Sequence, residues 1–296
     1  DLQKGAMTMR YYIVDVFAER KYAGNPLAVV LDAGALSDTA MQAIAREMHL
    51  SETAFVRSGG REGRAYDLRI FTPEHEVPFA GHPALGTAYV IREEVLREPV
   101  PEVRLNLAVG EIPVSFAPDG IAWMRQNPPV FTGEFSPDTL AGVLSLPETA
   151  IDPPFPVEEV STGLPFIIVP VRSLESVRRA VIDRDAYEAL IRTTEAKAVF
   201  VFCPEPYRPE NTFNARMFAD HFGVPEDPAT GSANGCLAGY LLRHGYFPGD
   251  SLDIRVEQGC EIHRPSLIRC RAERHGESIA LQVGGRVIPV ARGELL

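Results

Sequence analysis

Four side chains of this sequence are of types that could bind a small anion and move a proton on it: Glu52, His82, Asp227 and Ser232. A carboxylate at the edge of an apolar strand can become a workable base, because burial disfavours its charged form. An imidazole can donate a hydrogen bond or shuttle a proton. A second carboxylate can accept a hydrogen bond from a substrate amine or a histidine, and a hydroxyl can donate to a substrate oxygen. These residue types indicate acid–base chemistry.

Each of these residues also has a structural interpretation that the sequence leaves open. Spacing alone favours an exposed loop acid at Glu52, and a lone histidine is usually structural or solvated. Asp227 precedes a proline and suits a turn, whereas Ser232 suits a helix cap. Glu226 is the less constrained neighbour of Asp227. Small residues around His82, at the start of a predicted helix, favour the functional interpretation there.

Two glycines, Gly81 and Gly231, begin segments that are apolar nearly all round, at residues 81–93 and 231–243. Such a pattern predicts helices buried on most sides. The first N–H groups of a helix have no partner within it, and each helix start carries roughly half a positive charge. We therefore expect the two starts to face a shared cleft suited to a substrate carboxylate or a developing negative charge. The structural alternative is that each glycine only allows close packing.

The chain repeats a short pattern at an interval of about half its length. Arg69-Ile70-Phe71 is followed, after five residues, by Val77-Pro78, and Arg216-Met217-Phe218 is followed, after five residues, by Val224-Pro225. The flanking segments agree in type and order: strands at 27–31 and 166–169, helices at 37–49 and 184–192, and strands at 53–56 and 198–202. This repeat predicts a duplicated fold.

Most other predicted elements are short strands, so the expected fold class is α+β. Strands are predicted at 105–107, 112–116, 121–124, 252–256 and 266–271, with a final hairpin at 279–283 and 286–290 joined through Gly284-Gly285. Each half is expected to be a mostly antiparallel sheet wrapped around one central helix. Residues 9–125 form the first half, completed by the hairpin near 279–293, and residues 126–278 form the second. Residues 1–8 are expected to be an expression remnant.

The composition excludes several classes of function. The 296 residues are 45% hydrophobic and 23% charged, as in globular proteins, and the net charge of −11 argues against binding to nucleic acid or to anionic membranes. Because no signal peptide or membrane-spanning run is recognisable and the four cysteines form no Cys-x-x-Cys pair, we expect a reduced, cytoplasmic protein without a metal. No nucleotide-binding or hydrolase-elbow motif is present, so no cofactor is expected.

At these motifs the sequence resembles the PhzF-like family, which comprises a phenazine-biosynthesis isomerase and its relatives. The resemblance spans essentially the whole chain from about Met9. The residues that carry it are Asp15-Val16-Phe17 with Gly24-Asn25-Pro26-Leu27-Ala28-Val29, Leu50-Ser51-Glu52-Thr53-Ala54-Phe55-Val56, Phe71-Thr72-Pro73 with Gly81-His82-Pro83, and Glu226-Asp227-Pro228-Ala229-Thr230-Gly231-Ser232-Ala233.

The resemblance implies a diaminopimelate-epimerase-like fold with the active site between two similar halves. It also implies a homodimer and a cleft that closes over its ligand. Diaminopimelate epimerase carries a cysteine directly before the glycine of each central helix, whereas this chain has Ala80 and Thr230. A two-cysteine racemase mechanism is therefore excluded at these positions, and Cys236 lies too far into its helix to replace them.

The PhzF-like pattern instead implies that Glu52 is a general acid and base. It further implies that His82, Asp227 and Ser232 bind the substrate, with Gly81 and Gly231 at the helix starts. The implied reaction is cofactor-free isomerisation of a small carboxylate, in which one acid removes a proton from carbon and returns it elsewhere on the same face. Two alternatives stay open: a small-carboxylate binding protein without turnover, and a hydrolase that uses Ser232, His82 and Asp227.

Overall fold

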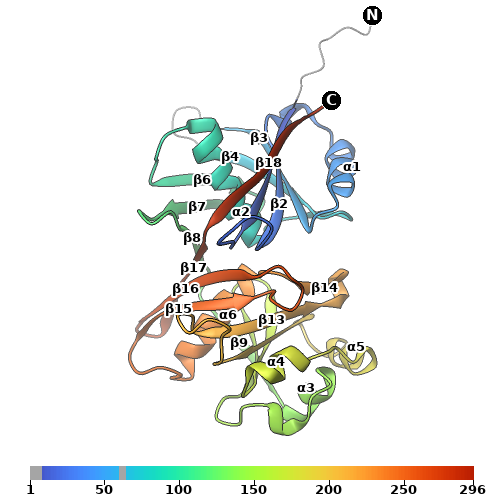
Figure 1. Ribbon diagram of the computed structural model, residues 1–296, viewed down its shortest axis with the longest axis vertical. Helices are drawn as coiled ribbons and strands as arrows, with labels where there is room; N and C mark the ends of the chain where they lie inside the picture. Colours follow the sequence, from blue (N-terminus) through green and yellow to red (C-terminus); the bar gives the residue numbers. More distant parts are fainter. Residues whose placement is uncertain (1–8, 60–64) are drawn as a thin grey trace, which may run out of the picture. The chain divides into compact units, whose positions relative to one another are not determined.

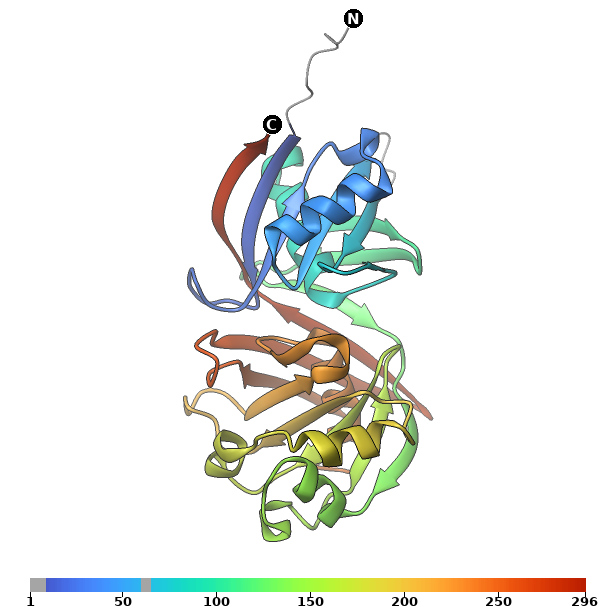
Figure 2. The same cartoon turned by 90° about the vertical axis from the view of Figure 1, so that its right-hand side faces the viewer.

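The computed structural model describes residues 9–59 and 65–296, which form two compact units (Figures 1 and 2). Unit 1 comprises Asp1–Met124 and Gly285–Leu296, and unit 2 comprises Arg125–Gly284. The boundaries expected from the sequence fall after residues 125 and 278. The expected expression remnant, residues 1–8, lies outside the described residues. Within the described part of the chain, no helix is both long enough and apolar enough to cross a membrane.

Unit 1 is a mixed sheet that encloses one helix. Its strands are β1 (Met9–Val16), β2 (Asn25–Val30), β3 (Glu52–Ser58), β4 (Tyr66–Phe71), β5 (Glu76–Val77), β6 (Glu102–Leu107), β7 (Gly110–Phe116), β8 (Ala122–Gln126, which runs across the boundary) and β18 (Val287–Leu295). The pairs β2–β3 and β4–β6 are parallel. The pairs β1–β2, β1–β18, β3–β4, β4–β5, β6–β7 and β7–β8 are antiparallel.

The enclosed helix is α2 (Gly81–Val90), followed by a wider π-helical turn at Ile91–Leu96. All of its residues except Gly81 and Tyr89 are buried, and it contacts β1, β2, β3, β6, β7 and β18. Small residues allow this close fit. A Cβ atom on Gly86 would lie 2.6 Å from Leu27 Cδ2 and 2.9 Å from Val16 Cγ2. The sheet therefore holds α2 at a distance that only glycine permits.

A second helix, α1 (Asp38–Met48), lies on the outside of unit 1 (Figure 2). Ser37 accepts a hydrogen bond at its side chain from Ala40 N at 3.2 Å, as a helix cap does. Met41 and Ala45 of α1 pack on Phe55 and Phe71 of the sheet. The predicted helix at 37–49 is thus confirmed, and it leads directly to Glu52 at the start of β3.

Unit 2 is also a mixed sheet that encloses one helix. Its strands are β9 (Val130–Phe135), β10 (Val157–Ser161), β11 (Pro165–Pro170), β12 (Ala198–Cys203), β13 (Phe213–Ala219), β14 (Val224–Asp227), β15 (Ser251–Gln258), β16 (Ser266–His275) and β17 (Ser278–Gly285). The parallel pairs are β11–β12 and β13–β15. The pairs β9–β10, β10–β11, β12–β13, β13–β14, β15–β16 and β16–β17 are antiparallel.

The enclosed helix of unit 2 is α6 (Gly231–Arg243), with the bounds predicted from the sequence. It contacts β10, β11, β15 and β16. Gly239 faces Pro129, whose ring atoms would lie 2.8 Å from an added Cβ. The shorter helices α3 (Pro137–Val143), α4 (Leu174–Arg179) and α5 (Arg184–Ile191) contribute to a separate apolar cluster around Tyr187 and Val199.

The predicted C-terminal hairpin is wrong. A two-residue hairpin turn of the expected type requires a positive φ at its central residues, and neither Gly284 nor Gly285 has one. β17 pairs with β16, and the chain continues past Arg286 into β18, which pairs along its length with β1. Figure 1 shows this last strand, in dark red, beside the blue first strand. Only β18 therefore belongs to unit 1.

The repeated Arg–x–Phe motif forms the same ion pair in each unit. Arg69 binds Glu76 through Nε–Oε1 at 2.7 Å and Nη2–Oε2 at 2.6 Å. Arg216 binds Glu226 in the same way, at 3.0 Å and 2.7 Å. Each guanidinium also lies over the phenylalanine two residues further on. Glu226 is therefore not the less constrained neighbour of Asp227, since both of its oxygens are held.

The two ion pairs differ in burial, which predicts unequal contributions to stability. The Arg216 and Glu226 side chains are only 10% and 9% exposed, and Arg216 also donates to the Val177 and Ala180 carbonyls. Arg216→Ala leaves a buried carboxylate unpaired, so we expect a loss of about 3–5 kcal/mol in the free energy of unfolding. Arg69 and Glu76 are 21% and 40% exposed, so Arg69→Ala should cost about 1 kcal/mol. Urea denaturation measures both, and equal losses would contradict this assignment.

Candidate active site

Glu52 is the first residue of β3 and is largely buried. It pairs in register with Leu27 of the parallel neighbour β2, and its side chain is 19% exposed. The interpretation that spacing alone favoured, an exposed loop acid, is therefore wrong. The reason is that α1 ends at Met48 and leaves only three residues before the strand, so the acid enters the sheet instead of a surface loop.

His82 is the second residue of α2 and lies beside Glu52. Its Nε2 is 3.3 Å from Glu52 Oε2, and the imidazole is 7% exposed. The residue before the helix, Ala80, has no side chain that could cap the first amides. Pro83 supplies no N–H, so the amides of Gly81 and His82 are the ones that this helix start can offer to an anion.

Burial lowers the pKa of His82 to about 3. Desolvation is the cause, because the charged imidazolium loses its contact with water in the apolar surroundings of α2. The imidazole is therefore neutral near pH 7 and is a poor proton acceptor. Of the two roles that the sequence allowed, donating a hydrogen bond fits this environment and shuttling a proton does not.

In unit 2, Asp227 and Ser232 flank the start of α6. Asp227 is the last residue of β14, and Thr230 is the residue that precedes the first turn of the helix. The Thr230 hydroxyl donates to Asp227 Oδ2 at 2.5 Å. Gly231 is buried, whereas Ser232 is half-buried. The structure thus brings Glu52 and His82 together in unit 1 and bonds Thr230 to Asp227 in unit 2, with Ser232 in the first turn of α6. The shared cleft stays a prediction.

Sequence reasoning missed three polar residues around the start of α6. Thr230 entered as a position without cysteine and within the family motif, and neither Gln258 nor Asn234 was given a role. Gln258, at the end of β15, is completely buried and bonds to Asp227, Thr230 and Asn234. It lies 28 positions from Thr230 in the chain, and only the pairing of β13 with both β14 and β15 brings the two together. No local pattern signals such a contact.

The cysteines do not form an alternative site. All four are free, and burial raises the pKa of Cys236 to about 12, so its thiol stays protonated and unreactive near pH 7. Among residues 9–59 and 65–296, no group of three His, Cys, Asp or Glu side chains could hold a metal ion.

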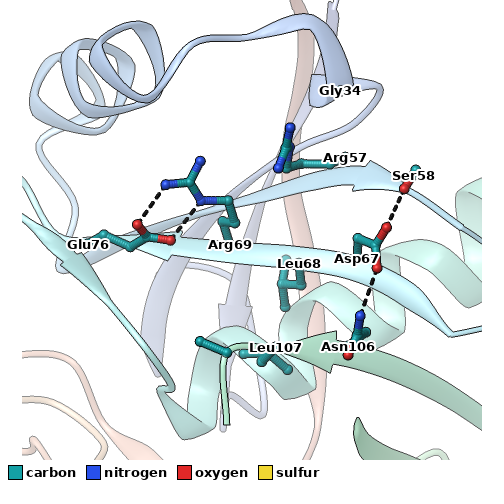
Figure 3. Close-up of a pocket in the computed structure, with 10 residues that line it drawn as sticks. Gly34, Arg57, Ser58, Asp67, Leu68, Arg69, Glu76, Asn106 and Leu107 are labelled. Atoms are coloured by element: carbon teal, nitrogen blue, oxygen red, sulfur yellow. Dashed lines mark hydrogen bonds and ion pairs between the residues drawn. The ribbon is translucent and has the colours of Figure 1, made fainter. Parts of the chain in front are cut away.

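Two surface cavities lie away from all the predicted site residues. One, of about 490 Å³, lies over β3, β4 and β6, where Arg69 binds Glu76, and Asp67 binds Ser58 and Asn106 (Figure 3). The other, of about 710 Å³, follows β15, β16 and β17. Most charges in the first cavity are already paired with each other, so it offers an external ligand few polar groups.

Comparison with known proteins confirms the family resemblance. Residues 14–293 match the PhzC-PhzF family, described as phenazine biosynthesis-like protein. The chain is 37% identical to trans-2,3-dihydro-3-hydroxyanthranilate isomerase of Pseudomonas aeruginosa, over 96% of this chain and 98% of that protein. It is 36% identical to an uncharacterised isomerase of Mesorhizobium japonicum, over 97% and 99% of the two chains.

Solved structures agree in fold. A Bacillus anthracis phenazine biosynthesis protein of the PhzF family matches with a TM-score of 0.90 and 28% identity, covering 98% of this chain and all of that one. A protein from Agrobacterium radiobacter described as a probable proline racemase matches with a TM-score of 0.61 at 12% identity, covering 98% of this chain and 93% of that one. The second likeness concerns the fold alone, which is the mixed, sheet-dominated fold common to both groups.

The neutral state of His82 predicts how stability depends on pH. Its pKa is about 3 in the folded chain and ordinarily 6.5, so between these values the unfolded chain binds a proton that the folded chain does not. The contribution of His82 to stability is therefore complete above about pH 6.5 and is lost as the pH falls toward 3. His82→Gln should flatten this part of the curve of unfolding free energy against pH. An NMR titration of His82 with a midpoint near 6.5 would contradict the assignment.

Proposed function

The chain belongs to the PhzC-PhzF family and is an isomerase, and from this we propose that it moves a proton on a small carboxylate-bearing substrate without a cofactor. The observation that carries the proposal is the pairing at the start of α2. There the carboxylate of Glu52 lies 3.3 Å from an imidazole that burial keeps neutral. A neutral imidazole places no positive charge beside this carboxylate.

Glu52 would act as both base and acid. It would remove a proton from a substrate carbon, hold it, and return it to another position on the same face. Its position supports this role, because the His82 imidazole that would orient the substrate lies 3.3 Å from its carboxylate. His82 would donate a hydrogen bond to the substrate, as a neutral imidazole can.

The helix starts would bind the negative charge. The amides of Gly81 and His82, and those of Gly231 and Ser232, are placed at the positive ends of α2 and α6. Asp227 would accept a hydrogen bond from a substrate amine. General acid–base catalysis is worth about 10²–10⁴-fold, so positioning and electrostatic stabilisation by these amides must supply the rest of the acceleration.

The relatives suggest the first substrate to test. Proteins of similar sequence in three species of Pseudomonas are named trans-2,3-dihydro-3-hydroxyanthranilate isomerase. That compound combines a carboxylate with an amine on a ring, the two groups that the helix starts and Asp227 would recognise. We propose a cyclic or amino carboxylate as the substrate class of this chain, with this compound as the first probe.

The repeated strand pairings suggest that the two units arose by duplication. Both units contain the same order of parallel and antiparallel pairs around a helix that begins with glycine, which is the pattern that a gene duplication produces. We also propose that the chain forms a homodimer, which sedimentation equilibrium would detect as twice the 32.5 kDa of one chain.

Replacing Glu52 by glutamine tests the proton carrier. Glu52→Gln keeps the shape of the side chain but removes the base, so isomerisation of trans-2,3-dihydro-3-hydroxyanthranilate should slow by about 10²–10⁴-fold. Deuterium uptake at the substrate carbon in D₂O, followed by NMR, should fall in parallel, while the affinity for the compound changes little. The exposed acid Glu47 on α1 gives a matched control, and Glu47→Gln should exchange at the wild-type rate.

Two outcomes would contradict the proposal. Full deuterium exchange by the Glu52→Gln variant would remove this residue from the mechanism. Tight binding of small carboxylates by the wild-type protein, with no exchange on any of them, would instead identify a binding protein on the same fold. Acylation of Ser232 by a serine-directed reagent would favour the hydrolase alternative.

A further inference from the structure

Gln258 ends β15 directly against the segment that carries Asp227. The turn that follows begins at Gly259, which has φ of +74°. A Cβ atom there would lie 2.6 Å from the carbonyl oxygen of Pro228 and 2.9 Å from its Cα atom. The backbone at the end of β15 therefore touches the connection between β14 and α6. A side chain at the end of β15 can therefore contact the segment between β14 and α6.

The Gln258 amide is completely buried, and its hydrogen-bonding capacity is fully used. Its Nε2 donates to the Asp227 carbonyl oxygen at 2.8 Å and to Thr230 Oγ1 at 3.1 Å. Its Oε1 accepts from Thr230 N at 3.2 Å and from Asn234 Nδ2 at 2.9 Å. A carbonyl can only accept and a backbone N–H can only donate, so the amide has one orientation that satisfies its partners.

This orientation determines the direction of the Thr230 hydroxyl. Because Gln258 Nε2 donates to the hydroxyl oxygen, the hydroxyl proton is left to point at Asp227 Oδ2, 2.5 Å away. A hydroxyl that donates to a carboxylate forms one of the stronger hydrogen bonds in proteins. The chain from Gln258 through Thr230 to Asp227 thus fixes the Asp227 carboxylate.

The same amide fixes the first turn of α6. Asn234 Nδ2 donates to Gln258 Oε1 and also to the Thr230 carbonyl oxygen, at 3.0 Å. Asn234 is itself completely buried. The backbone from Thr230 to Asn234, which contains the Gly231 and Ser232 amides, is therefore held at both ends by one network.

We propose that Gln258 is a positioning residue of the active site, which aims the Thr230 hydroxyl at Asp227 and fixes the first turn of α6. This inference rests on the proposed function. Gln258 acts through Thr230 and Asn234. Since a small misplacement of a reacting group can cost about 100-fold in rate, loss of the network should lower turnover more than stability alone explains.

Turnover of trans-2,3-dihydro-3-hydroxyanthranilate by matched variants tests the proposal. Gln258→Glu keeps the shape but replaces the donating NH₂ by an acceptor, and Thr230→Val removes the hydroxyl at constant shape. We expect each to lower kcat about 10- to 100-fold with KM changed less than about 3-fold, as for contacts made mainly in the transition state. Thr230→Ser restores the hydroxyl and should restore kcat. The double variant should be no slower than the slower single variant.

Glu257→Gln is the control for a merely structural effect. Glu257 is the buried neighbour of Gln258 on β15, but it accepts hydrogen bonds from Tyr207 N and Arg208 N in another loop. This variant should lose stability and keep kcat. Hydrogen–deuterium exchange should rise at least about 10-fold in peptides covering 227–236 for Gln258→Glu, and in peptides covering 205–211 for Glu257→Gln.

The two measurements separate the possible failures. Unchanged exchange over residues 227–236 in Gln258→Glu would overturn the network, whatever the protein catalyses. Wild-type kcat in Thr230→Val, or a Thr230→Ser variant as slow as the valine, would overturn the role of the hydroxyl. A wild-type protein that turns over no carboxylate would overturn the proposed function. Gln258 would then have no catalytic role, even if hydrogen–deuterium exchange still detected the network.

Discussion

The first amides of an apolar helix enclosed by strands have no partner within the helix, although they lie inside a largely apolar unit. The polar groups around both helix starts are arranged around this constraint. In α2 the residue before the helix is alanine, and the helix begins Gly-His-Pro, so two N–H groups stand at its positive end without a cap from that alanine. Burial costs little at the helix sides, where Gly86 lies against Leu27 and Val16. The groups of α2 that need hydrogen-bond partners are therefore the amides at its start, beside Glu52.

Unit 2 meets the same constraint differently. The start of α6 is surrounded by side chains that bond to each other as well as to the backbone, with Gln258 at the centre and the buried Arg216–Glu226 pair one residue before Asp227. Unit 1 has a neutral imidazole and one carboxylate at the equivalent place. One helix start is thus held by a polar network, and the other lies beside a single carboxylate.

Features that depend on neighbouring residues in the sequence could be predicted, and features that depend on distant strands could not. The bounds of α6 follow from an apolar run that begins with small residues, and Ser37 caps α1 as its type and position indicate. The hairpin at Gly284-Gly285 failed because two glycines are a turn signal only where the strands on either side pair with each other. Glu226 and Gln258 could not be placed, because their partners lie on other strands. The burial of Glu52 likewise depends on the sheet that forms around it.

The pairing of β18 with β1 has a consequence for how the chain is made. Among the described strands β1 is synthesised first and β18 last, so one edge of β1 has no partner until β18 has been made. Unit 2 is one continuous stretch, Arg125–Gly284, and can assemble before that. Domains usually fold in the order of their synthesis, whereas here the later unit 2 can be complete before unit 1. Until β18 pairs with it, this unpaired edge of β1 is the part of the nascent chain that can aggregate or bind a chaperone.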